Sequence, residues 1–289
     1  MKCLFAMALF FSFCSSAFAQ QKYSGKIIDT HGHVWFDDAE AKAIFPIRPG
    51  TADANLESLK KTGISRAGII VMATVKGDMV RTRKLNDQVV EFSKKHPDLV
   101  YPIGSVHPDD GDDALKELER LANLKIRVIK LHPNVQLFDV ASENVSKLAK
   151  KAGELGLILL FDGYAPLDSL QMDKFARLAM TNPKTKFIIA HMGGPRFQSV
   201  LAFQALALYG FQRNVWFDLS WYTHHIVTSP YKDQFVWVAR EVGVDRLLFG
   251  SDFPFVSRED AIKDISSLGF KKDELEKIFH ANAEELLGK

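Results

Sequence analysis

The stretch IIDTHGH at residues 27–33 decides how the rest of this chain is interpreted. Its two isoleucines predict a short buried strand, and two histidines follow with one glycine between them. Because successive side chains of an extended segment point to opposite faces, His31 and His33 lie on the same face. Two neutral imidazoles at a strand end can bind one metal ion, and Gly32 lets the backbone bend toward it. Alone, this motif is a weak indicator, so further ligands must come from elsewhere.

Residues 1–19 have the pattern of a cleavable signal peptide. Lys2 provides a positive start, an apolar run follows at 4–13, and residues 17–19 (AFA) fit the small-x-small cleavage pattern. The apolar run is shorter than the roughly 20 residues that a membrane-spanning helix needs. We therefore expect cleavage near Ala19 and a mature chain, residues 20–289, that is periplasmic or secreted.

Both cysteines, Cys3 and Cys14, lie in this leader, so the mature chain has no disulfide and depends on core burial for stability. About 270 residues remain (289 − 19), enough for one large domain. Without Lys2 they carry 36 basic (37 − 1) and 35 acidic residues, a formal charge of +1. This balance gives no reason to expect nucleic acid or, after leader removal, a membrane as a partner. The charge balance does not determine the oligomeric state of the protein.

Short aliphatic runs alternate with longer amphipathic ones along the mature chain. They predict strands at 26–29, 66–73, 100–106, 126–131, 157–161, 186–190, 214–219 and 246–249. Helices are expected at 52–61, 80–95, 112–121, 142–155, 168–180, 198–209 and 231–242, with two or three more at the end. The strands are continuously apolar, as parallel strands covered on both faces are. Eight β/α units in about 250 residues predict a single-domain (β/α)8 TIM barrel. The alternative, a doubly wound open sheet, is disfavoured because no Gly-x-Gly-x-x-Gly follows a strand.

Functional residues of such barrels lie at the C-terminal ends of the strands. Polar residues follow six of the expected strands, namely His31 and His33, His107, Lys130 and His132, Asp162, His191, and Asp252. The joint pattern, rather than any single motif, indicates one assembled site. Taken singly, His191 could be a core histidine and Asp252 a turn cap. His107 and His132 each precede proline and could be loop packing residues.

Two or three neutral imidazoles with one or two carboxylates suit Zn²⁺. Asp252 could take a proton from a metal-activated water and pass it to a leaving group, while His191 or Lys130 stabilises an oxyanion. Lys130 and His132 are two residues apart and share a face, which favours both as candidate catalytic residues. Lys130 could instead be a substrate clamp, a solvated strand end or a carboxylated ligand that bridges two metals.

Aromatic residues after the strand ends suggest an apolar, aromatic-lined pocket for a small-molecule substrate. They are Trp35, Phe36, Tyr164, Trp221, Tyr222, Phe253 and Phe255. Arg48, Arg196 and Arg258 lie in the same loops and could hold a carboxylate in bidentate fashion.

Five segments carry a family resemblance: IDTHGH at 28–33, VIKLHP at 128–133, IAHMGG at 189–194, LFGSDFP at 248–254 and NAEELL at 282–287. In their order they resemble the metal-dependent hydrolase (amidohydrolase) superfamily, and within it the amidohydrolase-related group that includes nonoxidative aromatic-acid decarboxylases. The resemblance implies a barrel with one or two divalent ions, most often zinc. It implies His31 and His33 as ligands, His191 as ligand or acid/base partner, and Asp252 as ligand and proton shuttle.

One residue departs from this pattern. The family usually has a histidine at the end of strand five, where this chain has Asp162. A carboxylate can also bind zinc, but it is a harder, negatively charged ligand. Asp162 therefore either replaces the histidine as a ligand or leaves the site with fewer protein ligands.

Three functions remain open at this point. The first and favoured one is an exported metal-dependent hydrolase that cleaves an amide, ester or lactone. The second is a metal-dependent decarboxylase of an aromatic or unsaturated carboxylic acid. The third is a noncatalytic barrel that binds metal or ligand, in which Asp162 marks a decayed site.

Overall fold

Eight parallel strands form the centre of the computed structural model, which describes residues 23–288. They are β1 Ile28–His33, β2 Arg66–Ile70, β3 Val100–Ser105, β4 Val128–Leu131, β5 Ile158–Phe161, β6 Lys186–Ile189, β7 Val215–Asp218 and β8 Leu247–Leu248. Each strand pairs with the next in chain order. Main-chain bonds from Thr30 N to Phe249 O (2.9 Å) and from His33 N to Phe253 O (2.7 Å) join the last segment to the first. This confirms the (β/α)8 barrel and rules out the open sheet.

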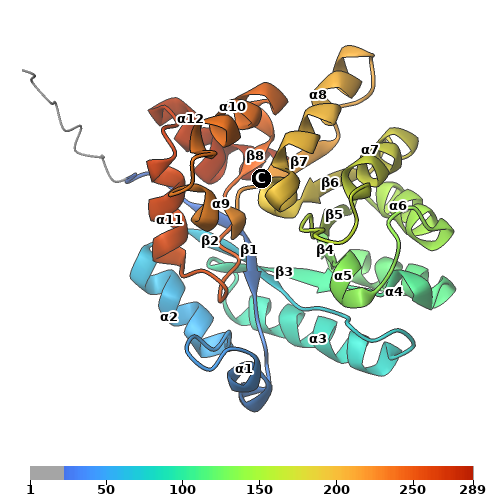
Figure 1. Cartoon of the computed structure of the whole chain (residues 1–289). Coiled ribbons are helices and arrows are strands. Elements are labelled where there is room, and N and C mark those ends of the chain that lie inside the picture. The colour runs from blue at the N-terminus through green and yellow to red at the C-terminus, as the bar shows by residue number, and fades with distance from the viewer. Residues whose placement is uncertain (1–22, 289) are drawn as a thin grey trace, which may run out of the picture.

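Helices surround the strands on all sides (Figure 1). They are α1 Asp38–Ile44, α2 Ala52–Thr62, α3 Met79–Lys95, α4 Asp112–Asn123, α5 Pro133–Gln136, α6 Glu143–Leu155, α7 Gln171–Thr181, α8 Leu201–Leu208, α9 Tyr222–Ile226, α10 Lys232–Val242, α11 Arg258–Ser267, α12 Lys272–Glu276 and α13 Asn282–Leu287. Their ends follow ordinary capping chemistry. Ser142 accepts a bond from the backbone of Val145 and begins α6, and Gly156 ends it in the left-handed conformation. No helix among the described residues is long and apolar enough to cross a bilayer.

The hydrophobic core has two parts. One lies between the strands and the surrounding helices, and the other fills the inside of the barrel. The inner part includes Ile28, Val128 and Leu160 from the strands, together with Ala283 and Leu286 from α13. Helix α13 therefore closes the N-terminal end of the barrel, and only the C-terminal ends of the strands are left for a site.

Some expected boundaries were wrong. Strand β1 begins at Ile28 and continues through His33, whereas the sequence predicted 26–29, and its register against β2 shifts between Asp29 and Gly32. The short helices α1, α5 and α9 lie in loops that follow β1, β4 and β7 and were not expected. The predicted signal peptide, with Cys3 and Cys14, lies outside the described residues.

Candidate metal centre

Three donor atoms from β1 and from the loop after β8 form a nearly equilateral triangle. The Nε2 atoms of His31 and His33 are 3.2 Å apart, and each is 3.3 Å from Oδ1 of Asp252. Tetrahedral bonds of about 2.0–2.1 Å from zinc to nitrogen or oxygen place two ligand atoms about 3.3 Å apart. The three atoms therefore fit one face of a tetrahedral metal site, which has a fourth position for water or substrate.

The backbone brings these side chains together by close packing. Asp252 has a left-handed backbone (φ 57°), which aspartate tolerates better than most residues, and its N–H donates to the carbonyl of His31 (2.7 Å). Gly32 is required for space, because a Cβ there would lie 2.7 Å from Nη2 of Arg258. Likewise, a Cβ at Gly250 would lie 2.9 Å from the Cβ of His31.

A buried carboxylate orients the His31 ring. Oδ2 of Asp218, at the end of β7, lies 3.0 Å from Nδ1 of His31. Burial raises the pKa of Asp218, but His31 and the Ser220 hydroxyl hold it well below its usual range, so the group is ionised. Asp218 accordingly accepts the Nδ1 proton and puts the lone pair on Nε2, the nitrogen that belongs to the triangle. Burial lowers the pKa of His33 to about 4, so this second imidazole is also neutral at pH 7.

Sequence reasoning missed Asp218. It ends the apolar run VWFD, and applying the strand-end rule to strand seven would have found it.

His191 lies beside the triangle, where both its ring nitrogens are occupied. Its Nε2 is 3.0 Å from Oδ2 of Asp162, and its Nδ1 is 2.9 Å from Oγ of Ser220. Because Ser220 donates its own proton to Oδ1 of Asp218, it must accept the Nδ1 proton of His191. Burial lowers the pKa of His191, but the Asp162 carboxylate outweighs this and raises it to about 9. The ring is therefore held as an imidazolium.

Asp162 has its own set of partners. Its Oδ1 accepts the N–H of Tyr164 (3.0 Å), and its Oδ2 also lies 3.4 Å from Nε2 of His132. A second group with mutually close donor atoms consists of His31, His191 and Asp218. The structure thus places Asp162 against His191 rather than in the triangle. Its role as a metal ligand stays a prediction, as does that of His191.

Lys130 is fully buried between the triangle and Asp162. Its Nζ lies 3.0 Å from Nε2 of His31 and 3.9 Å from Oδ2 of Asp162. Burial lowers the pKa of His132 to about 4, and the Nδ1 of this ring is buried with no partner among the described residues. His107 is instead a loop packing residue, whose Nε2 donates to the carbonyl of Gln136 (2.7 Å).

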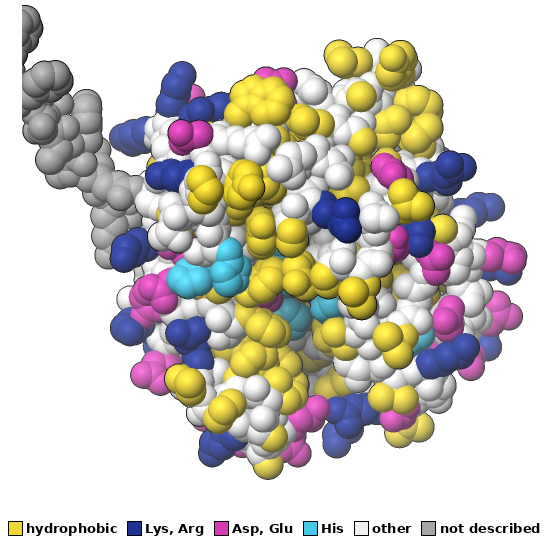
Figure 2. Space-filling view, viewed as in Figure 1, with side chains coloured by type: hydrophobic (Ala, Val, Ile, Leu, Met, Phe, Trp, Pro, Cys, Tyr) yellow, Lys and Arg dark blue, Asp and Glu magenta, His cyan; other side chains and the backbone are white. Residues whose placement is uncertain are grey.

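A cleft of about 510 Å³ opens from His33 toward α1 and α3. The apolar part of its wall includes Trp35, Ile44, Met72 and Val135. Figure 2 shows hydrophobic side chains gathered around the histidines on this face.

Aromatic rings flank the site on two sides. The rings of Trp35 and Phe255 each lie 5.9 Å from the ring of His33. On the other side, Trp221 lies edge-on to His191 at 5.5 Å and to Tyr164 at 5.0 Å. Of the expected aromatic lining, Tyr222 packs against Trp221 and His225 away from the triangle. Phe253 is buried beneath the guanidinium of an arginine from α11.

The expectation that Arg258 holds a substrate carboxylate was wrong. Arg258 is the arginine whose guanidinium covers Phe253. It is fully buried and forms an ion pair with Asp29, with 2.9 Å between Nε and Oδ2. Arg48 donates to the carbonyl of Pro254 (3.0 Å), and Arg196 donates to that of Ala165 (3.4 Å). Position in a loop does not reveal which way a side chain points, which is why the sequence misplaced Arg258.

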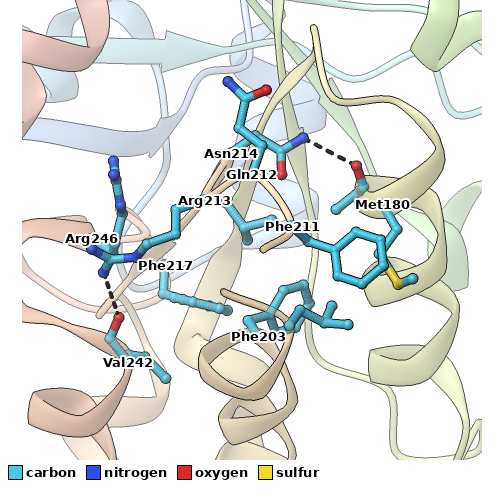
Figure 3. Close-up of a pocket in the computed structure, with 12 residues that line it drawn as sticks. Met180, Phe203, Phe211, Gln212, Arg213, Asn214, Phe217, Val242 and Arg246 are labelled. Atoms are coloured by element: carbon cyan, nitrogen blue, oxygen red, sulfur yellow. Dashed lines mark hydrogen bonds between the residues drawn. The ribbon is translucent and has the colours of Figure 1, made fainter. Parts of the chain in front are cut away.

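A second pocket lies at the opposite end of the strands, where β7 begins (Figure 3). Phe203, Phe211 and Met180 line it together with two arginines. One of them, Arg213, donates to the carbonyl of Val242 (3.0 Å), as Figure 3 shows. The volume of this second pocket, about 30 Å³, is enough for about one water molecule. This pocket is therefore a packing defect remote from the triangle.

The fold is similar to that of several solved enzymes. For 2,6-dihydroxybenzoate decarboxylase from Rhizobium the TM-score is 0.72 at 16% identity, covering 91% of this chain and 99% of that one. For 5-carboxyvanillate decarboxylase from Novosphingobium aromaticivorans, complexed with manganese and 4-hydroxy-3-methoxy-5-nitrobenzoic acid, it is 0.69 at 16% identity, covering 93% and 99%. For a probable 2-pyrone-4,6-dicarboxylic acid hydrolase from Acinetobacter baumannii with citric acid bound, it is 0.66 at 18% identity, covering 92% and 100%.

None of the curated proteins matches the sequence. A family model described as Amidohydrolase matches residues 28–289, nearly the whole described chain. The chain therefore belongs to the amidohydrolase family, in its amidohydrolase-related group of metal-dependent enzymes.

Proposed function

We propose that this protein is a zinc-dependent hydrolase that cleaves an amide, ester or lactone bond in a small molecule. The observation that carries the proposal is the triangle of His31, His33 and Asp252, with donor separations of 3.2–3.3 Å. Two imidazoles and one carboxylate are a donor set suited to zinc, and three protein ligands are typical of catalytic rather than structural zinc. Such an ion, when bound, supplies a Lewis acid that lowers the pKa of a coordinated water to about 7.

Asp252 would be the residue that accepts a proton from the attacking water. Burial raises its pKa, but its close contacts with His31 and His33 hold it below the usual range, so the carboxylate is ionised at neutral pH. A carboxylate at this position can accept the proton and then transfer it to the leaving group.

Two basic side chains lie close to the triangle. Lys130 and the imidazolium of His191 face the site from β4 and from the end of β6. Fixed positive charges in a site that excludes water stabilise negative charge that develops on a carbonyl oxygen. Asp162 keeps His191 in its charged form through the 3.0 Å contact, so we assign Asp162 a supporting rather than a ligating role.

A decarboxylase of an aromatic or unsaturated acid is the second candidate. The aromatic rings that flank the triangle favour it, because a planar substrate can stack between them. Against it, the loop arginines that could hold a substrate carboxylate donate to backbone carbonyls or are buried. This is why we favour hydrolysis.

The test combines metal analysis with product analysis. Purified protein should contain close to one zinc or related divalent ion per chain, lose activity with a chelator and regain it when the ion returns. A panel of aryl esters, lactones and amides should yield the corresponding acids, whereas a panel of aromatic acids should release no CO2. If CO2 is released and Arg48→Ala or Arg196→Ala abolishes the release, the decarboxylase is the correct function. Sub-stoichiometric metal and no turnover would support the noncatalytic barrel.

We also propose that the protein is exported after cleavage near Ala19. The signal-peptide pattern of residues 1–19 supports this. Expression of the full chain followed by N-terminal sequencing should find Gln20 as the first residue of protein recovered from the periplasm or medium. An intact Met1 on cytoplasmic protein would contradict it.

A further inference from the structure

The strongest unexplained feature outside the triangle is a buried guanidinium directly below it. Arg258, the first residue of α11, has no exposed surface. Its Nε donates to Oδ2 of Asp29 (2.9 Å), and its Nη2 donates to Oδ1 of Asn55 (2.8 Å). Removing an ion pair from water costs several kcal/mol per ion, so a pair like this one is weak evidence for stability alone.

The Asp29 carboxylate joins the two segments that supply the donor triangle. Its Oδ1 accepts the N–H of His31 (3.1 Å) and the N–H of Ser251 (2.9 Å). Its Oδ2 accepts the hydroxyl of Ser251 (2.6 Å) in addition to Arg258. One carboxylate therefore ties the backbone of a histidine in β1 to the residue immediately before Asp252.

Asn55 completes the arrangement from α2. Its Nδ2 donates to the carbonyl of His33 (3.0 Å), while its Oδ1 accepts from Arg258. The guanidinium also packs against the chain between the two histidines, as the 2.7 Å approach to a Cβ at Gly32 shows. Through Asp29 and Asn55, Arg258 thus reaches the backbone of both histidines and the residue that precedes the aspartate.

The barrel needs such a connection at this place. Strand β8 has only two residues, and no ladder pairs it with β1, so a few main-chain bonds hold the aspartate opposite the histidines. We propose that Arg258, Asp29, Asn55 and Ser251 form a positioning clamp that sets the separation of the two imidazoles from the Asp252 carboxylate, and thereby the affinity for the metal. This inference rests on the proposed metal centre.

The test measures zinc affinity apart from folding. Ser251→Ala removes one hydroxyl and keeps the backbone N–H bond to Asp29, so this variant is the mild perturbation. Arg258→Met removes the charge and keeps an unbranched apolar stem. We expect zinc affinity, measured by competition with a chromophoric chelator, to fall about 10- to 100-fold in Arg258→Met, the range typical for residues that support metal ligands. Ser251→Ala should show a smaller loss of zinc affinity in the same direction, and urea unfolding of its metal-free form measures separately how far the fold itself is weakened.

Arg240 offers a matched control. Its guanidinium forms a two-point ion pair with Glu274 (2.9 Å for both bonds) and lies over the ring of Phe270, as Arg258 lies over Phe253. Arg240→Met should leave zinc affinity at the wild-type value. If Ser251→Ala and a folded Arg258→Met bind zinc as tightly as wild type, the clamp does not position the ligands. If Arg258→Met fails to fold, the result for Ser251→Ala decides. Wild-type protein that binds no zinc would instead overturn the metal centre, and the clamp with it.

Discussion

The neutral state of the largely buried His132 ring leads to a pH dependence that can be worked out from the structure. Burial lowers its pKa from 6.5 to about 4, and its Nδ1 has no partner among the described residues. The unfolded chain therefore binds a proton at this ring below pH 6.5, while the folded chain does so only near pH 4. The neutral ring contributes its full stability above pH 6.5, and this contribution is lost as the pH falls toward 4. Between pH 7 and pH 4.5, linkage gives a loss of about 2 kcal/mol from this residue.

The substitution His132→Gln removes this titration while keeping a polar side chain. Urea unfolding of the metal-free protein at pH 7 and pH 4.5 should show that the variant loses about 2 kcal/mol less than wild type between the two values. His225→Gln is the control, because it makes the same substitution at an exposed histidine. An identical pH dependence in His132→Gln and wild type would refute the reasoning.

Four further predictions concern the candidate metal centre and the hydrophobic core inside the barrel. His33→Ala should remove most of the bound metal and the turnover, as measured by elemental analysis and by the ester panel; retention of both would exclude it as a ligand. Asp162→His should raise zinc occupancy if residue 162 is at a ligand position, but because Asp162 contacts His191 instead, we expect no gain in zinc by elemental analysis. Asp218→Asn should weaken zinc binding about 10- to 100-fold in a chelator competition, because the amide no longer fixes the proton on Nδ1 of the neighbouring histidine. Leu286→Ala, in the inner core, should lower the free energy of unfolding by about 2–5 kcal/mol in urea titrations without changing zinc affinity.

The sequence predicted the barrel and the residues of its triangle for a clear physical reason. Long apolar runs mark buried parallel strands, and a polar residue directly after such a run must lie at one rim. His31, His33 and Asp252 are found in this way, and the contacts of His191 and Asp162 also follow from their strand ends.

Other features depend on contacts that no local pattern encodes. The helices α1, α5 and α9 have seven, four and five residues, too few for a 3.6-residue periodicity to be visible. Arg258 follows a strand end as a substrate-binding residue would, but the chain enters α11 there and turns the side chain under Gly32. Whether a charged residue in such a loop faces solvent or core is decided by tertiary packing alone.

The closure of the barrel by α13 has a consequence for molecular exchange. Hydrocarbon side chains fill the interior below the histidines, so no route for water or solutes runs through the cylinder from underneath. Small molecules can instead reach the histidines through the cleft beside Trp35 and Met72, which opens from His33. A molecule held in this cleft therefore blocks the approach of the next one from that side.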